Sequence, residues 1–400
     1  MFLALLCFYT VYFDSRLYMV TWNVATRHPE EDLNQMLGFG VMGKAKVQER
    51  LPDFYVVGLQ EVKSQPQNIL MDAIFDDPWT NAYRDVLAAK DYVKVKTIRL
   101  QGLLLSLFCL RKHLLHLRDI ETQYTRTGFG GMWGNKGAVT IRLSIYGCSV
   151  CIVNCHLTPH DHLLQERITD YNNIIKSQLF RAKETSNIFF HDYVFWIGDL
   201  NFRLMDGLSA EEIDQQVKKG EITRLLDQDQ LRKVMASGEA FSELYEQLPT
   251  FPPTYKFEFH SSRYDLKRRP SWTDRILYKV NANVYENLTL QAEQVSYRSI
   301  GEYIQSDHKP VVGEFVIKDG FTSLEDYLCY VYAVKGAVSG NSNGRIKKVI
   351  FPETAVRGPG LYRLLYFNHN SGSVLGMSDA FQVCRRDNGQ VTQFVCREGY

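Results

Sequence analysis

FWIGDLNFRL, residues 195–204, ends an apolar run with a carboxylate, an amide and a cation in quick succession. Such a run predicts a buried strand, and the end of a rigid strand can present polar side chains to a cleft. Asp199 is then a candidate to take a proton from water, and Asn201 a candidate to hold that water or a phosphate oxygen. Taken alone, the stretch is equally compatible with an ordinary Gly-Asp turn. Its meaning depends on what else in the chain stands beside it.

Polar residues also stand at the ends of other predicted strands. TWNV places Asn23, GLQE places Glu61 and NCHL places His156 at strand ends, while SDHKP places Asp307 and His308 just before the last strand. Glu61 offers the hard, anionic oxygen that suits Mg²⁺. The two histidines are able to donate to phosphate oxygens as charge develops. Each residue has an ordinary structural explanation, but their recurrence at matching positions indicates a shared site.

Apolar runs and alternating patterns predict an α/β chain. Strands are expected at 17–24, 53–61, 102–110, 138–146, 150–157, 193–199, 274–280 and 310–317, and helices around 160–182, 209–219 and 238–247. Several runs are apolar throughout, as in strands covered on both faces, and no regular parallel βαβ period appears. Two packed β-sheets with helices outside are therefore predicted over residues 1–318. In 319–400, short strand-like runs separated by turns such as SGNSNG predict a small all-β sandwich.

Composition describes a globular protein without a general charge field. Lys and Arg number 46 against 45 Asp and Glu, so any anion binding must be local. Eight cysteines are too few for a disulfide scaffold, and the C-x2-C-x3-C run of 148–155 lies in a strand-like segment, so buried free thiols are expected. The apolar first thirteen residues are shorter than the about 20 of a spanning helix and lack the flanks of a signal peptide. An irregular or strand-extending N-terminus, no transmembrane span and a cytosolic location are predicted.

Blocks around these strand ends resemble a known family. WIGDLNFRL (196–204) and RPSWTDRILYK (269–279) are highly specific to the inositol polyphosphate 5-phosphatases, with weaker matches in TWNVAT, GLQEV, GNKGAV, NCHL, FPPTYKF and SDHKPV. The resemblance spans about residues 18–317 and implies the four-layer fold of the superfamily that includes deoxyribonuclease I. The tail resembles a SKICH domain, chiefly in LYRLLYFNHNSGSVLGMSDAFQV (361–383). Residues 319–330 lack the aromatic, acidic opening strands of that domain, so an incomplete or rearranged fold is expected.

The resemblance implies catalytic roles for five residues. Asp199 would act as base on the attacking water, and Asn201 would steady the water and the phosphate. His156 and His308 would bind the phosphate that is removed. Asp274 would orient the imidazole of His308.

The resemblance also implies a metal site and a substrate pocket. Glu61 would bind Mg²⁺, with Asn23 and Asp307 close to the metal. Contacts to the neighbouring 4-phosphate would come from one group of side chains: Tyr255, Lys256, Lys267 and Arg269. Lys136, in the Gly-rich GFGGMWGNKG, is a further phosphate candidate, although a surface lysine on a turn is an equally good interpretation. A substrate with adjacent phosphates needs several cations beside the metal.

The function implied is Mg²⁺-dependent hydrolysis of the 5-phosphate by direct attack of water. Substrates would be phosphoinositides such as phosphatidylinositol 4,5-bisphosphate and 3,4,5-trisphosphate, and soluble inositol polyphosphates. The expected partners are phosphoinositide headgroups at a membrane surface, such as the cytoplasmic face of the plasma membrane or endoplasmic reticulum, and a protein bound through the C-terminal β domain. No nucleic-acid partner is expected.

Other chemistries fit the chain less well. No cysteine has the arginine of a C-x5-R phosphatase, and DQDQL (227–231) lacks the threonine of D-x-D-x-T, which disfavours a covalent phosphoenzyme. GFGVMGK (38–44) imitates a Walker A loop but is followed by Ala45 in place of Ser or Thr. Two alternatives remain. A nuclease on the same scaffold is opposed by the neutral charge and the TYKF and KRRPSW elements, and an inactive adaptor recruited through the β tail is opposed by the intact strand-end residues.

Overall fold

The computed structural model describes residues 2–8, 13–39, 50–63, 77–128, 133–205, 207–282 and 289–319, together with the strands of 333–383 named below. By their contacts, residues 13–319 form one compact unit, and residues 1–12 and 320–400 form another. Most of the Walker A-like segment, residues 40–44, lies outside the described residues, as do 129–132 of the Gly-rich loop.

The larger unit contains two β-sheets. One has the order β11-β12-β2-β3-β5-β4 and the other the order β10-β9-β8-β7-β6. The strands of the first are β2 (Phe13–Asn23), β3 (Phe54–Gln60), β4 (Tyr92–Leu100), β5 (Leu103–Leu110), β11 (Ala292–Ser299) and β12 (Val311–Asp319). The strands of the second are β6 (Leu117–Gly128), β7 (Trp133–Ile145), β8 (Cys148–His156), β9 (Tyr193–Asp199) and β10 (Asp274–Val280).

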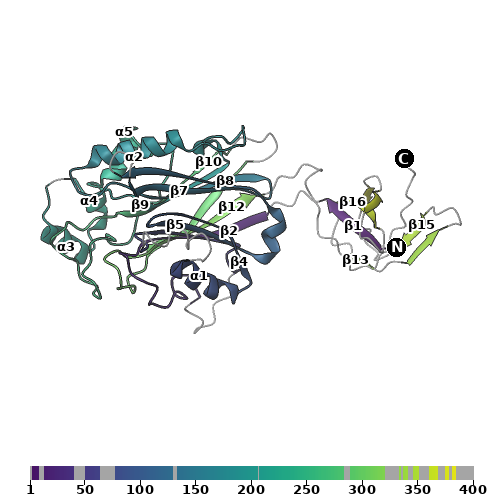
Figure 1. Ribbon diagram of the computed structural model, residues 1–400, viewed down its shortest axis with the longest axis horizontal. Helices are drawn as coiled ribbons and strands as arrows, with labels where there is room; N and C mark the ends of the chain where they lie inside the picture. Colours follow the sequence, from purple (N-terminus) through teal and green to yellow (C-terminus); the bar gives the residue numbers. More distant parts are fainter. Residues whose placement is uncertain are drawn as a thin grey trace. The chain divides into compact units, whose positions relative to one another are not determined.

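Helices cover the outer faces of both sheets (Figure 1). The helix α1 (Pro78–Ala88) lies on the six-stranded sheet, and α2 (Leu164–Ser177) and α5 (Gln230–Ser237) lie on the five-stranded one. The remaining helical segments are α3 (Ala210–Lys218), α4 (Ile222–Leu226) and the short 3-10 turns η2 (Arg111–His116) and η3 (Ile188–Phe190). The predicted four-layer α/β architecture is therefore confirmed.

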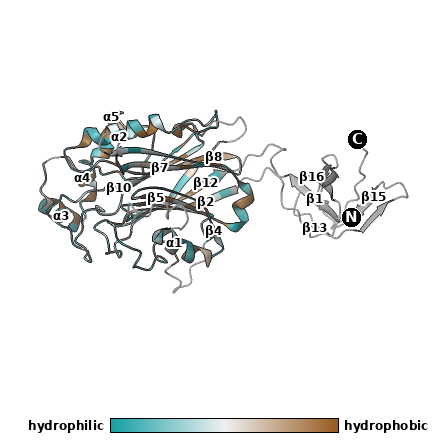
Figure 2. Cartoon of the chain, viewed as in Figure 1, coloured by the Kyte–Doolittle hydropathy of each residue, from teal (hydrophilic) through white to brown (hydrophobic). Residues whose placement is uncertain are grey.

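Three apolar clusters hold these layers together. One fills the space between the sheets and includes Val56, Ile141 and Phe195. The second packs α1 on the six-stranded sheet, and the third packs α2 and α5 on the five-stranded sheet. Figure 2 shows hydrophobic and hydrophilic residues alternating along α2 and α3, as one-sided burial requires. The described helices include none that is both long and apolar enough to cross a bilayer.

Helix ends follow local side-chain chemistry. Asp77 caps α1 by accepting from the backbone N–H of Trp79 and Thr80, and Ser209 forms a capping box with Glu212 at α3. The helix predicted at 238–247 is wrong. Gly238 ends α5 with a φ of +80°, and the following chain turns until Tyr245 forms backbone hydrogen bonds with Tyr278 of β10.

The expected free thiols are confirmed for the described cysteines. Cys109, Cys148, Cys151 and Cys155 are buried thiols outside any disulfide. Burial raises the pKa of Cys151 and Cys155, and the indole N–H of Trp196 donates to Cys155 Sγ at 3.1 Å.

The smaller unit is described by its strands. A sheet joins β1 (Phe2–Phe8) to β13 (Ala333–Val334) and β16 (Gly360–Phe367), and β16 also pairs with β17 (Val374–Met377) and β18 (Phe381–Val383). A separate hairpin pairs β14 (Ala337–Gly340) with β15 (Ile346–Ile350). The predicted strand-rich tail is confirmed, and the apolar N-terminal segment supplies one of its strands.

Candidate functional site

Sheet register brings three predicted residues into one row. In the parallel pair β8–β9, His156 lies opposite Asp199, and in the antiparallel pair β9–β10, Asp199 lies opposite Asp274. Gly198 precedes Asp199 with a φ of +142°, and a Cβ there would lie 2.1 Å from the carbonyl oxygen of Cys155. The glycine of this stretch is therefore required by the close approach of β8 to β9.

The six-stranded sheet supplies the facing residues. Asn23 ends β2, Glu61 follows β3 and His308 precedes β12. Asn23 Nδ2 donates to Asp199 Oδ2 at 3.0 Å, and His156 Nε2 lies 3.9 Å from Glu61 Oε1. The ends of the two sheets thus bring strand-end residues from across the chain into one cluster, as the sequence predicted.

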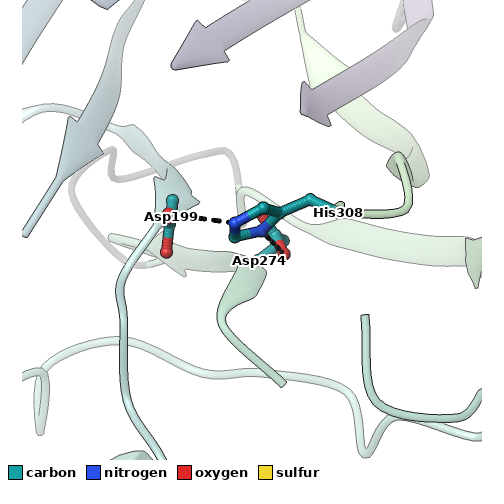
Figure 3. Close-up of side chains that lie close together, drawn as sticks. All are labelled: Asp199, Asp274 and His308. Atoms are coloured by element: carbon teal, nitrogen blue, oxygen red, sulfur yellow. Dashed lines mark hydrogen bonds and ion pairs between the residues drawn. The ribbon is translucent and has the colours of Figure 1, made fainter. Parts of the chain in front are cut away.

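His308 and Asp274 form a buried charged pair (Figure 3). Nδ1 of His308 lies 2.9 Å from Oδ2 of Asp274, which also accepts from the hydroxyls of Thr254 and Thr273. Burial alone would lower the pKa of His308, but the Asp274 carboxylate outweighs burial and raises this pKa to about 9. The imidazole is therefore held as a cation, with Nε2 at 4.0 Å from Oδ2 of Asp199.

Asp199 is surrounded by donors. Besides Asn23, the backbone N–H of Asn201 donates to Oδ1 at 3.1 Å, and His156 Nε2 lies 3.3 Å from Oδ2. Burial raises the pKa of Asp199, yet His156, His308 and Lys136 together hold it well below the usual range. Asp199 is thus an ionised, buried carboxylate, and either of its two oxygens can accept a proton.

The pKa of His156 is shifted in the opposite direction from that of His308. Nζ of Lys136 lies 2.5 Å from Nε2 of His156. Burial, then the Lys136 charge, lower the pKa of His156, and burial lowers the pKa of Lys136 as well. The structure brings Lys136 into the cluster, although the sequence alone also allowed a surface turn.

Two sets of side chains are candidates for binding a metal ion. Within the described part of the chain, Asp199, Asp274 and His308 offer ligand atoms within 4.8 Å of one another. A metal ligand must be deprotonated, and His308 is held protonated by Asp274, which disfavours this triad. Glu61 fits a hard cation better, because its carboxylate is 42% exposed and lies beside the cluster, 3.9 Å from Nε2 of His156. The backbone of Glu61 has a φ of +54°. Asp307 is ion-paired to Lys256 at 3.7 Å.

The segment predicted to contact a second phosphate adjoins the cluster. The Tyr255 ring centroid lies 4.4 Å from that of His308, and the backbones of these two residues form a β-bridge. Lys256 Nζ lies 3.7 Å from both Asp265 and Asp307, and Lys267 is exposed. Arg269 donates to Asp161 at 2.9 Å and to the carbonyls of Leu204 and Met205, so it holds the neighbouring backbone in place.

Sequence reasoning missed Arg203, which stands two residues after Asn201 in the opening stretch. Its Nε donates to the backbone oxygen of Asn201 at 3.1 Å, and its Nη2 donates to Oδ1 of the same residue. The guanidinium carbon lies 4.5 Å from the ring centroid of Tyr255. The only sequence signal was its position in a motif, because a buried arginine is not distinguishable from an exposed one by spacing.

Comparison with known proteins identifies the family. Residues 20–314 match the model of endonuclease/exonuclease/phosphatase family 2, and residues 280–383 match that of the SKICH domain. The chain is 32% identical to inositol polyphosphate 5-phosphatase K of Mus musculus over 93% of this chain and 90% of that protein. It is 33% identical to phosphatidylinositol 4,5-bisphosphate 5-phosphatase A of the same species over 92% of this chain, but spans only 42% of that relative's length.

Solved structures agree on the fold. The inositol polyphosphate 5-phosphatase domain of SPsynaptojanin, in complex with inositol (1,4)-bisphosphate and calcium ion, matches with a TM-score of 0.65 and 29% identity over 80% of this chain and 87% of that one. A Cimex nitrophorin also matches, with a TM-score of 0.61 and 25% identity over 76% of this chain and 99% of that one, so the fold alone does not specify the chemistry. Within endonuclease/exonuclease/phosphatase family 2, this chain belongs to the inositol polyphosphate 5-phosphatases.

Proposed function

We propose that this protein hydrolyses the 5-phosphate of phosphoinositides and inositol polyphosphates by direct attack of water. The observation that carries the proposal is the buried row of His156, Asp199 and Asp274, completed by a cationic His308 and adjoined by the Tyr255–Lys256 segment. The row offers donors and a proton acceptor for one phosphate, and the segment offers a ring and an ammonium for a second. The names of the relatives supply the substrate class.

The proposed roles of the site residues follow from their charges and hydrogen-bonding groups. Asp199 accepts the proton of the attacking water while the water oxygen bonds to phosphorus and the bond from phosphorus to the inositol oxygen breaks. The inositol oxygen leaves as a hydroxyl after it takes a proton from solvent. The low pKa of Asp199 in the free protein keeps it ionised, and the negative charge of a bound phosphate would raise that pKa through like-charge repulsion. Asn201 orients the water, and the His308 cation stabilises the negative charge on the phosphoryl oxygens. His156 and Lys136 contact the same phosphate.

A divalent cation fits beside this row. Glu61 would hold it, with the amide oxygen of Asn23 and the Asp307 carboxylate nearby, and hard oxygen ligands of this kind suit Mg²⁺. The cation would supply charge neutralisation for the phosphate. The calcium ion in the SPsynaptojanin domain supports a divalent site, and we propose Mg²⁺ as the working metal of this protein.

Location and partners complete the proposal. The lipid substrates place the protein at the cytoplasmic surface of the plasma membrane or endoplasmic reticulum, bound peripherally. Residues 319–400, which overlap the SKICH match, are proposed to form a separate domain that binds a protein partner. Inositol phosphates, and not nucleic acid, are the proposed ligands of the cleft.

The test is phosphate release by the full chain with Mg²⁺. Substrates are vesicles containing phosphatidylinositol 4,5-bisphosphate or 3,4,5-trisphosphate, soluble inositol 1,4,5-trisphosphate, and plasmid DNA. Release from the inositol substrates without DNA cleavage is expected. DNA cleavage without phosphate release would assign the nuclease alternative, and inactivity on all substrates would assign the adaptor.

A further inference from the structure

Arg203 is a buried cation that the mechanism above does not use. The residue is 4% exposed, and its guanidinium faces both halves of the site, Asn201 on one side and the Tyr255 ring on the other. Removing a buried cation from water is costly, so its position requires compensating contacts. The two hydrogen bonds to Asn201 and the stacking on Tyr255 provide them.

The contacts of Arg203 determine how the Asn201 amide is oriented. A guanidinium can only donate hydrogen bonds, so Nη2 selects the amide oxygen and leaves the NH₂ group for acceptors. One of those N–H groups donates to the carbonyl oxygen of Leu157 at 3.0 Å. The second N–H remains for a water or a phosphate oxygen. Turning the amide over would place NH₂ against the guanidinium and oxygen against the Leu157 carbonyl, and both contacts would be repulsive.

The same guanidinium holds an unfavourable backbone conformation. Asn201 has a φ of +55°, in the left-handed region. Nε and Nη2 of Arg203 donate to the backbone and side-chain oxygens of this one residue. The guanidinium and Asn201 thus form a closed, hydrogen-bonded ring. Arg203 is itself anchored, because its backbone N–H donates to Gln230 Oε1 at 3.0 Å and its carbonyl accepts from Gln230 N–H at 2.9 Å.

We propose that Arg203 is a positioning residue that fixes the Asn201 amide for the attacked phosphate and links it, through Tyr255, to the pocket for the neighbouring phosphate. The inference rests on the proposed function and deepens it by naming the side chain that joins the two phosphate subsites. Lysine cannot replace this arginine, because an ammonium is a point charge without a planar pair of donors.

The experiment compares Arg203→Lys with Arg142→Lys in the full chain. Arg142 is also buried, 3% exposed, and its guanidinium donates to His191 Nε2 at 3.2 Å and to the carbonyl oxygen of Asp119 at 2.9 Å, away from Asn201, Tyr255 and Gln230, so it is a matched control. Arg203→Lys should lower kcat on inositol 1,4,5-trisphosphate roughly 10–100-fold with little change in KM, because a small misplacement of a reacting group is costly. Arg142→Lys should lower the melting temperature and leave kcat of the folded protein within about 3-fold.

A double-mutant cycle separates positioning from general stability. If Arg203 acts through Asn201, then Arg203→Lys should cost almost nothing further in an Asn201→Ala background. Arg203→Gln, which is neutral and keeps an NH₂ donor, is carried through the same cycle so that the test does not depend on one variant folding.

The outcomes are distinguishable. An inactive parent protein would overturn the proposed function itself. An active parent with unchanged kcat in Arg203→Lys, or fully additive losses in the cycle, would overturn only the role of Arg203.

Discussion

At the scale of single residues, the pKa values of two histidines beside the same carboxylate shift in opposite directions. The Asp274 carboxylate at Nδ1 outweighs burial and raises the pKa of His308, whereas burial and then the Lys136 charge lower the pKa of His156. Two imidazoles beside Asp199 with such different partners can serve different functions in one reaction.

The first prediction concerns the His308 cation and pH. Activity that needs this cation should fall as pH rises through about 9. The raised pKa also stabilises the fold, fully below the ordinary His value of about 6.5, and this contribution is lost as pH rises through about 9. Asp274→Asn should move both alkaline transitions to lower pH. The measurement is kcat and melting temperature against pH, and transitions that stay in place would exclude the Asp274–His308 pair as their cause.

The second prediction concerns the base. Asp199→Asn preserves shape but removes the proton acceptor, so kcat should fall by roughly 10²–10⁴-fold while substrate binding is largely kept. Steady-state turnover and a direct binding titration measure the two quantities separately. Near-parental turnover would show that another group takes the proton.

The third prediction concerns the metal. Glu61→Gln replaces an anionic oxygen ligand by a neutral one, so the Mg²⁺ concentration that gives half-maximal activity should rise steeply. A chelator should abolish activity of the parent protein, and added Mg²⁺ should restore it. Activity that persists with the chelator would rule out the metal-assisted mechanism.

At the scale of elements, the sequence predicted the central strands of the sheets better than the edge strands and the helices. The strands that end on Asn23, His156 and Asp199 were found because their cores are continuous apolar runs. The strands β4 and β11 were missed because, as edge strands, they carry lysines, arginines and glutamates between their apolar residues. The false helix at 238–247 came from an amphipathic pattern that ignored Gly238 as a helix terminator.

The candidate site was predictable where its residues stand at the ends of strands. Residues from five strands or their flanks were placed together because strand termini meet at one end of a sheet pair. Arg203 was not predictable, because its role depends on a φ of +55° at Asn201 and on the ring of Tyr255, fifty-two positions away in sequence. Long-range contacts of this kind are set by packing and leave no local pattern.

The fourth prediction concerns the segment that carries Tyr255 and Lys256. Each charge-assisted contact to a 4-phosphate is worth about 1.5–3 kcal/mol, or roughly 10–150-fold. Lys256→Ala and Lys267→Ala should therefore lower kcat/KM strongly on 4,5-bisphosphorylated headgroups and much less on a 5-monophosphate. Lys218→Ala, an exposed lysine on α3, is the control. Equal losses on both substrates would argue against a 4-phosphate pocket.

At the scale of the whole molecule, the two units differ in what they contribute. Every candidate catalytic, metal and substrate residue lies within 13–319, which has its own apolar clusters between and outside its sheets. The other unit takes its strands from both ends of the chain, since β1 pairs with β16 over residues 2–8. A long-range pairing of this kind predicts that residues 1–12 matter for the smaller unit and not for the chemistry.

The last prediction follows from this division. A fragment of residues 13–319 should fold and hydrolyse soluble inositol 1,4,5-trisphosphate with a kcat/KM within about 3-fold of the full chain, because it keeps every contact of the site. Asp199→Asn in the fragment is the control for contaminating phosphatase. A chain of residues 13–400 should keep the same activity but lose protection of the 360–367 backbone in hydrogen exchange, because β1 no longer pairs with β16. Loss of soluble-substrate activity in a folded 13–319 fragment would show that the smaller unit takes part in catalysis. Unchanged protection of 360–367 would show that this strand is stable without its N-terminal neighbour.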